Sequence, residues 1–267
     1  MKIAMQTARL SGDSLREKFT FARTFGFDGV EINLSPDDDL ANRIDELQDA
    51  VEASGVPVAA FCSHGGNDPL QPDPALRAER FAELTRLLDL ADQVGAAGIV
   101  CVPVRRPVAF PDLSEHELFA FAVEEFDRWS NTLPVGNAKV FFEPLNRFEA
   151  TFLRRVEQGV ALAAAVDHPR VAALADLFHM NIEEASMSLP ILEAGAWLGH
   201  VHVADNNRLQ PGAGCLDFSV PFGALKRIGF DGWLAIESAL GGPLADRGPM
   251  AMLPETVSFL RHAWATA

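Results

Sequence analysis

The chain has 267 residues, of which 48% are hydrophobic and 22% charged, so it is long enough to bury a sizeable core as one large domain or two small ones. The net charge of −15 gives the surface a negative potential that repels nucleic-acid phosphates and anionic lipids. We therefore expect neither nucleic acid nor membrane as a partner, whereas a small neutral substrate is compatible with this charge.

The cysteines and the first residues indicate the compartment. Cys62, Cys101 and Cys215 form no closely spaced pair, which argues against a disulfide framework or a thiolate zinc site and fits a reducing environment. The first ten residues lack the long apolar core of a secretory signal, and no apolar run has the length of a membrane span. We expect a cytoplasmic protein.

Short runs rich in β-forming residues alternate with amphipathic stretches along the chain. The expected strands, in chain order, are residues 2–7, 29–34, 57–63, 98–104, 139–144, 171–177, 200–205 and 233–238. Between them, apolar residues recur at three- and four-residue steps, as in 15–26, 43–55 and 77–95. Each of these three stretches closes on a glycine suited to a helix C-terminus.

This alternation predicts a parallel sheet covered by helices. Eight strand–helix units in 267 residues average about 33 residues each, the size of the repeating unit in a (β/α)8 TIM barrel. No G-x-G-x-x-G motif follows the first strand, which argues against an open dinucleotide-binding sheet. We therefore predict an α/β fold, with one TIM-barrel domain that spans residues 1–267.

Four chemically active side chains come at the ends of four consecutive predicted strands: Glu143, Asp176, His202 and Glu237. In TIM barrels the chemistry lies at these strand ends, so the four side chains should lie next to one another around half of the mouth. Taken singly, each could make a salt bridge or cap a helix. Their matching positions on successive strands favour a shared role instead.

A shared divalent cation would explain the burial of these acids. An ionised carboxylate packed against the filled interior of a barrel is strongly destabilised unless it has a partner, and one cation would serve all of them. The oxygen-rich set suits Mn²⁺, Mg²⁺ or Co²⁺ at least as well as Zn²⁺. Because side chains alternate along a strand, Phe141, Leu174 and Ala235 should face inward below three of the four residues. His200 should face inward below His202, either as a core histidine or as one that orients a ligand.

Four stretches resemble one family of barrel enzymes. They are EPLNRFE (143–149), DLFHMNIEE (176–184), HVHVADNNRLQPGAGCLDF (200–218) and GFDGWLAIES (229–238). Together they resemble the xylose isomerase-like TIM-barrel sugar isomerase/epimerase superfamily, and within it most closely the ketose 3-epimerases of the tagatose or psicose type. The motifs cover residues 139 to 240, and the expected barrel layout matches over the whole chain.

The resemblance implies roles for individual residues. One divalent ion, Mn²⁺ in the first instance, would be held by Glu143, Asp176, His202 and Glu237. The two glutamates would also be the catalytic acid/base pair. The residues expected to bind the substrate are Glu149, His179 and Arg208, at the carbonyl end of the sugar, and His64, in the pocket lining.

The implied reaction is C3 epimerisation of a free ketose through a cis-enediolate. Metal coordination would polarise the carbonyl, while one glutamate on each face of the sugar acts as base and as acid. Proton return to the opposite face inverts C3, and return to the neighbouring carbon moves the carbonyl, so the sequence leaves epimerase and aldose–ketose isomerase both open. We expect an unphosphorylated sugar or polyol as substrate, and family analogy implies a homodimer or homotetramer.

Other functions on the same barrel are an inosose dehydratase, a hydroxypyruvate-type isomerase, an apurinic endonuclease and a non-catalytic sugar-binding protein. An endonuclease needs several zinc ions and a basic groove, which seven histidines and a net charge of −15 do not favour. The complete set of four ligands argues against a non-catalytic role. The first half of the chain departs from the epimerases, since it has no tyrosine and carries CVPVRRP at 101–107, so the identity of the sugar stays open.

Overall fold

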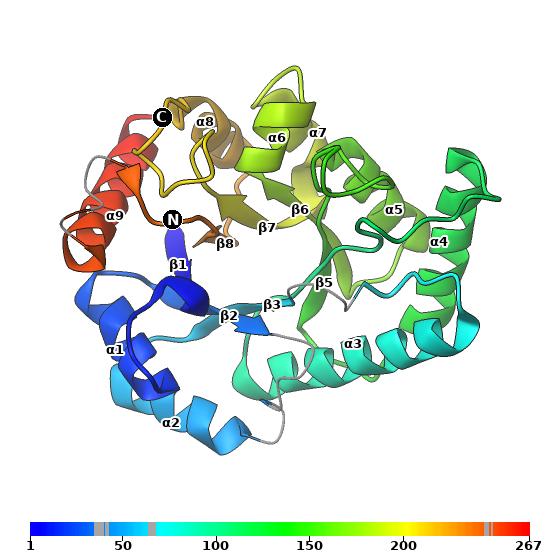
Figure 1. Ribbon diagram of the computed structural model, residues 1–267, viewed down its shortest axis with the longest axis horizontal. Coiled ribbons are helices and arrows are strands. Elements are labelled where there is room, and N and C mark those ends of the chain that lie inside the picture. The colour runs from blue at the N-terminus through cyan, green and yellow to red at the C-terminus, as the bar shows by residue number, and fades with distance from the viewer. Residues whose placement is uncertain (35–39, 41–42, 64–67, 243–245, 247) are drawn as a thin grey trace.

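The computed structural model describes residues 1–34, 40, 43–63, 68–242, 246 and 248–267. Within these residues, eight parallel strands close into a barrel in chain order, with β8 paired to β1 (Figure 1). The strands are β1 (Lys2–Gln6), β2 (Gly29–Leu34), β3 (Val58–Ser63), β4 (Gly98–Cys101), β5 (Lys139–Phe142), β6 (Val171–Asp176), β7 (Leu198–Val203) and β8 (Trp233–Ile236). The predicted TIM barrel is confirmed.

Helices surround this barrel (Figure 1). They are α1 (Leu15–Thr24), α2 (Ile44–Ser54), α3 (Pro74–Val94), α4 (Glu115–Ser130), α5 (Val156–Val166), α6 (Leu177–Glu183), α7 (Leu189–Ala194), α8 (Ser219–Arg227) and α9 (Pro249–Thr266), with short 3-10 turns η1 (Thr7–Arg9) and η3 (Gly195–Trp197). Helices α2 and α3 end at Gly55 and Gly95, whose φ angles of 72° and 71° are those of a left-handed cap, as the sequence predicts. None of the described helices combines the length and the apolarity needed to cross a bilayer.

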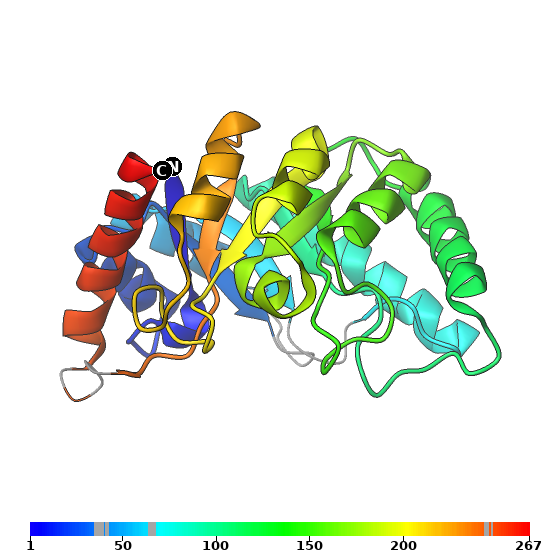
Figure 2. The ribbon, with the colours of Figure 1, turned by 90° about the horizontal axis from the view of Figure 1, so that it is seen from above.

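β2 has its predicted bounds, and the other seven strands differ from theirs by one to three residues at an end; β4 and β7 differ most, for local reasons. β4 ends at Cys101 rather than at residue 104, because the Pro103 carbonyl accepts a hydrogen bond from the Leu70 amide instead of from a neighbouring strand. β7 ends at Val203, because the amide of Asp205 donates to the Leu209 carbonyl within its own loop. The loops after β5 and β7 and the described residues just after β8 lie along the same edge of the barrel (Figure 2).

The barrel interior is filled by inward-facing side chains, as the alternation along the strands predicts. One buried cluster comprises Ala60, Cys62, Val100, Phe141, Ala172 and Leu174. A second one contains Ala4, Ala59 and Ala235, with Trp233 packed against it. These two clusters make much of the interior apolar, while Gln6, Glu31 and His200 are buried polar residues of the same barrel.

β7 contains a bulge at Gly199, where the strand lies close to the side chains of the barrel interior. Ala173 pairs with Leu198 and Leu174 with His200, so Gly199 is left as the extra residue on β7. A Cβ atom on Gly199 would lie 2.6 Å from an edge carbon of the Phe141 ring and 3.0 Å from the Ala172 methyl group. Such distances are too short for a methyl group, so only glycine fits at this position.

We predict that Gly199→Ala lowers the free energy of unfolding by about 1–3 kcal/mol, because the added methyl group overpacks the interior against Phe141. Urea denaturation of the variant measures this loss. Gly223→Ala is the matched control, since a Cβ on Gly223, within α8, meets no atom within 4 Å and alanine favours a helix. Equal stability of Gly199→Ala and the wild type would contradict the packing described.

Candidate active site

The structure brings together the side chains that the sequence places at four strand ends: Glu143, Asp176, His202 and Glu237. One potential ligand atom from each of the four lies within 4.8 Å of those of the others. Nδ1 of His202 lies 3.0 Å from Oε1 of Glu143 and 2.8 Å from Oε2 of Glu237. Glu143, Asp176 and His202 are buried, and Glu237 is only slightly more exposed. We call this group the acidic cluster.

The backbone at the strand ends positions these side chains. The amides of Glu143 and Glu237 continue the strand ladders by one residue, because they donate to the carbonyls of Cys101 and Val203. Asp176 is the last residue of β6 and caps α6, where its Oδ1 accepts a hydrogen bond from the Phe178 amide at 2.8 Å. Oδ2 of Asp176 is thereby left to face the cluster.

The charges of the acidic cluster suit a divalent cation. Burial opposes a positive charge on His202, yet Glu31, Glu237 and Glu143 raise its pKa well above the usual range for histidine. The site therefore favours positive charge strongly. Three carboxylates and one imidazole are also an ordinary ligand set for Mn²⁺ or a similar ion, so the side chains present fit the metal that the sequence predicts.

Arg208 lies against the acidic cluster from the loop after β7. Its Nη1 is 2.6 Å from Oδ2 of Asp176, its Nη2 is 2.8 Å from Oε2 of Glu237, and its guanidinium lies 4.7 Å from the centre of the Phe178 ring. Its backbone has a positive φ of 62°, which is unusual for arginine. The predicted substrate-binding arginine is therefore fixed beside two of the four clustered residues.

Buried Asp205 organises the loop that carries Arg208. Its carboxylate accepts hydrogen bonds from the amides of Asn206, Gly212 and Leu216, all at 2.9 Å. The Arg208 carbonyl accepts a bond from the amide of Ala239, just after β8, at 2.8 Å. These bonds tie the loop to the neighbouring strand end and keep the unusual backbone geometry of Arg208 in place.

His179 and Glu149 are linked by a residue to which the sequence assigns no role, Asn146. The backbone amide of Asn146 donates to Nδ1 of His179 at 3.2 Å, so the proton of that ring lies on Nε2, which is 3.5 Å from Oδ2 of Asp176. The side-chain amide of Asn146 lies 2.8 Å from the same Nδ1 and donates to Oε1 of Glu149 at 2.8 Å. Asn146 is buried and so holds both predicted substrate-binding residues in place.

Glu31 is a second residue that the sequence reasoning missed. It is fully buried within β2 and contacts both His200 and His202. Burial alone would raise the pKa of Glu31, but the two histidines hold it well below its usual range. A charged residue in the middle of the apolar strand GVEINL was the available signal. His64, the remaining predicted substrate-binding residue, lies outside the described residues.

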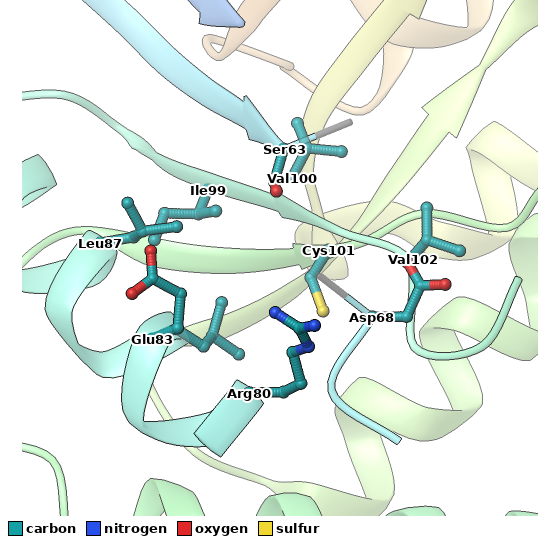
Figure 3. Close-up of a pocket in the computed structure, with 10 residues that line it drawn as sticks. Ser63, Asp68, Arg80, Glu83, Leu87, Ile99, Val100, Cys101 and Val102 are labelled. Atoms are coloured by element: carbon teal, nitrogen blue, oxygen red, sulfur yellow. The ribbon is translucent and has the colours of Figure 1, made fainter. Parts of the chain in front are cut away.

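The segment after β4, where the sequence departs from the epimerases, is anchored on both sides. Arg105 binds Asp68 through its amide at 3.1 Å and its Nε at 3.2 Å, and the Arg106 amide donates to the Glu149 carbonyl at 2.8 Å. Asp68 also lines a cavity of about 20 Å³ together with Arg80 and Cys101 (Figure 3). Among the described residues that line it, none belongs to the acidic cluster.

The fold and the site together define a TIM barrel with a buried cluster of acids and a histidine, which could hold a cation, at the C-terminal ends of its strands. Residues 19–262 match the family model described as xylose isomerase-like TIM barrel. The chain belongs to this family.

Individual proteins of known name or structure are also similar to this chain. The chain is 29% identical to the 3-dehydro-D-guloside 4-epimerase of Escherichia coli (strain K12) over 98% of its own length and 99% of that protein's. It is 33% identical to a probable ketose 3-epimerase of Synechocystis sp., over 83% and 78% of the two lengths. The crystal structure of 3-keto-D-glucoside 4-epimerase from E. coli superposes with a TM-score of 0.86 at 26% identity and covers 98% of this chain and 99% of that one.

We predict that a divalent ion bound at the acidic cluster stabilises the folded protein. Ligand binding to the native state alone adds about 2.7 kcal/mol at one hundred times Kd, so Mn²⁺ should raise the melting temperature of chelator-treated protein. Asp176→Asn should abolish this rise, whereas Glu183→Gln, which removes an acid that pairs with Arg147 instead, should keep it. An equal rise in wild type and Asp176→Asn, measured by calorimetry, would contradict the assignment.

Proposed function

We propose that the chain is a divalent-metal-dependent sugar epimerase, an isomerase that inverts a carbon next to a carbonyl, in the first instance C3 of a free ketose. One observation carries the proposal: Glu143 and Glu237 converge on His202 from strands three positions apart in the barrel. An epimerase must remove a proton from one face of a carbon and return a proton to the other face. Two carboxylates at one buried site can carry out these two transfers.

The proposed mechanism assigns the residues as follows. Glu143, Asp176, His202 and Glu237 would hold the ion, which when bound polarises the carbonyl and offsets the negative charge that develops on its oxygen. Each carboxylate has two oxygens, so Glu143 and Glu237 can each keep one in the cluster and use the other for proton transfer. One glutamate then removes the proton from the carbon, and the other delivers a proton to the opposite face.

The remaining side chains would orient the sugar. Arg208 provides a fixed positive charge beside Asp176 and Glu237, and Nε2 of His179 carries a proton that a sugar oxygen can accept. Glu149 accepts from Asn146 and keeps a second oxygen free of that bond for a sugar hydroxyl. In keeping with the sequence, we further propose Mn²⁺ as the ion, an unphosphorylated substrate, a cytoplasmic location and a homodimeric or homotetrameric assembly.

A second candidate is 4-epimerisation of a 3-keto-glycoside. The chain and the E. coli 3-dehydro-D-guloside 4-epimerase cover each other almost completely, at 98% and 99%, whereas 78% of the Synechocystis ketose 3-epimerase is covered. C4 of such a substrate also lies next to a carbonyl, at C3, so the same two glutamates could carry out the reaction. The two candidates differ in the substrate and not in the chemistry of the site.

Incubation in D2O with Mn²⁺ tests the proposal on a panel of D-psicose, D-tagatose, L-ribulose and a 3-keto-D-glucoside. Epimerisation incorporates deuterium at the inverted carbon, at C3 of a ketose or C4 of the glycoside, and NMR identifies the position. A shifted carbonyl would indicate an aldose–ketose isomerase, and loss of water a dehydratase, and either result would contradict the proposed reaction.

Glu143→Gln and Glu237→Gln should each lower kcat by about 10²-fold or more, because a proton-transfer group typically contributes at least that much. The comparison is made at saturating metal and with circular dichroism to verify folding. Near-normal turnover by either variant on the substrate found in the panel would refute the two-glutamate mechanism.

Asn146→Ala should lower kcat/KM about tenfold or more, because Glu149 loses the side-chain donor that orients it and Nδ1 of His179 keeps only the backbone amide of residue 146 as a partner. The adjacent variant Arg147→Ala is the control, since Arg147 is exposed and pairs with Glu183 away from the cluster. Steady-state kinetics should separate the two variants clearly. If both had the same kcat/KM as the wild type, Asn146 would have no role in positioning.

A further inference from the structure

Glu31, on β2, lies inside the barrel next to His202 of the acidic cluster and receives hydrogen bonds from three side chains. Nε2 of Gln6 donates to its Oε1 at 2.9 Å, and Nε2 of His200 lies 2.8 Å from its Oε2. Nε2 of His202 lies 3.1 Å from Oε1 and 3.3 Å from Oε2. Glu31 and both histidines have no exposed surface, so water cannot replace these partners.

These contacts determine which nitrogen of His202 faces the proposed metal. An ionised carboxylate can only accept hydrogen bonds, so both imidazoles carry a proton on Nε2 where they meet Glu31. Nδ1 of His202 is then the ring atom that faces the cluster, at 3.0 Å from Glu143 and 2.8 Å from Glu237. The ring is held from one side so that its other nitrogen is available to a ligand.

We propose that Glu31 is a positioning residue of the metal site: it accepts the Nε2 proton of His202 and so fixes Nδ1 as the metal-binding atom. The inference rests on the metal site of the proposed function. A carboxylate behind a ligating histidine orients the ring and makes it a better ligand, and loss of such a partner typically weakens metal binding. Within the barrel, this partner comes from β2, across from the strands that carry the acidic cluster.

The surroundings of Glu31 support this role, because they hold the carboxylate in one place. Gln6 on β1 is the residue that pairs with Glu31 in the sheet, and its amide approaches from the side of its own strand. His200 is stacked on Phe141, with ring centres 5.2 Å apart and planes inclined by 17°. The bulge at Gly199 makes room for the Phe141 ring. It therefore also supports His200, which stacks on that ring and in turn holds Glu31.

A second metal ion between Glu31, His200 and His202 is the alternative, since their potential ligand atoms also lie within 4.8 Å of one another. Two observations argue against it. The Gln6 amide directs an N–H group at Oε1 of Glu31, which leaves only Oε2 for a cation, and Nε2 of each histidine, already within hydrogen-bond distance of Glu31, would have to give up its proton to bind it. The positioning role predicts one ion per chain, whereas the alternative predicts two.

The test compares wild type with Glu31→Gln after chelation and reloading. Glutamine presents an N–H group where Glu31 has an oxygen, so one of the three donors loses its acceptor. We expect Kd for Mn²⁺, from competition titration, to rise about 10- to 100-fold in the variant. Wild-type protein should hold one ion by elemental analysis, and its Zn²⁺-loaded form should show the Nε2-protonated tautomer of His202 in long-range ¹H–¹⁵N NMR.

Asp92→Asn is the matched control. Asp92 is an acid at the other end of the barrel, where it pairs with Arg170 and accepts from the amide of Ala138, just before β5, at 2.8 Å. This variant should lose stability but keep the wild-type Kd for Mn²⁺.

Three results would overturn the inference. They are an unchanged Kd in folded Glu31→Gln, two ions per wild-type chain, or a proton on Nδ1 of His202 in the Zn²⁺-loaded wild type. The last two need no variant and so decide the matter even if Glu31→Gln fails to fold. Wild-type protein that binds no divalent ion would instead overturn the proposed function, and this inference with it.

Discussion

The arrangement of the site depends on the buried imidazole of His202, which has carboxylates next to both of its ring nitrogens. Nδ1 of His202 faces Glu143 and Glu237, and Nε2 faces Glu31, all within 3.3 Å. Acids buried this closely repel one another unless positive charge lies between them. His202 and Arg208 supply positive charge at this place, and the divalent cation that we propose would add to it and assist the removal of a proton beside a carbonyl.

The barrel makes this concentration of charge tolerable, because the buried acids have polar partners, such as Gln6 and His200 for Glu31, while much of the remaining interior is apolar. The clusters around Phe141 and around Ala235 fill the space below the strand ends, so the buried acids interact with one another and with Arg208 rather than with water. Backbone bonds that continue the ladders past β5 and β8 fix two of the acids. In the proposed function the strand ends would hold the metal and the catalytic acids, and the loops, such as the one organised by Asp205, would add the groups that contact the sugar.

Much of this was predictable from the sequence, for physical reasons. The alternation of strands and helices predicts the barrel. Each of Glu143, Asp176, His202 and Glu237 lies within one residue of a strand end, so the predicted strands already bring the four together. Glu31 and Asn146 were missed because their roles depend on contacts between distant strands and loops; the charge of Glu31 within an apolar strand marks that residue but does not identify its partners. The end of β4 was misplaced because VPV looks like a strand, although Pro103 bonds to Leu70 instead.

A crystal structure of the Mn²⁺-loaded protein, with anomalous diffraction data collected at the manganese edge, tests the central claim most directly. We expect a single anomalous peak among the four side chains of the acidic cluster, with Nδ1 of His202 as a ligand and Nε2 still bonded to Glu31. A peak between Glu31 and the two histidines, or no peak among the four side chains, would contradict it.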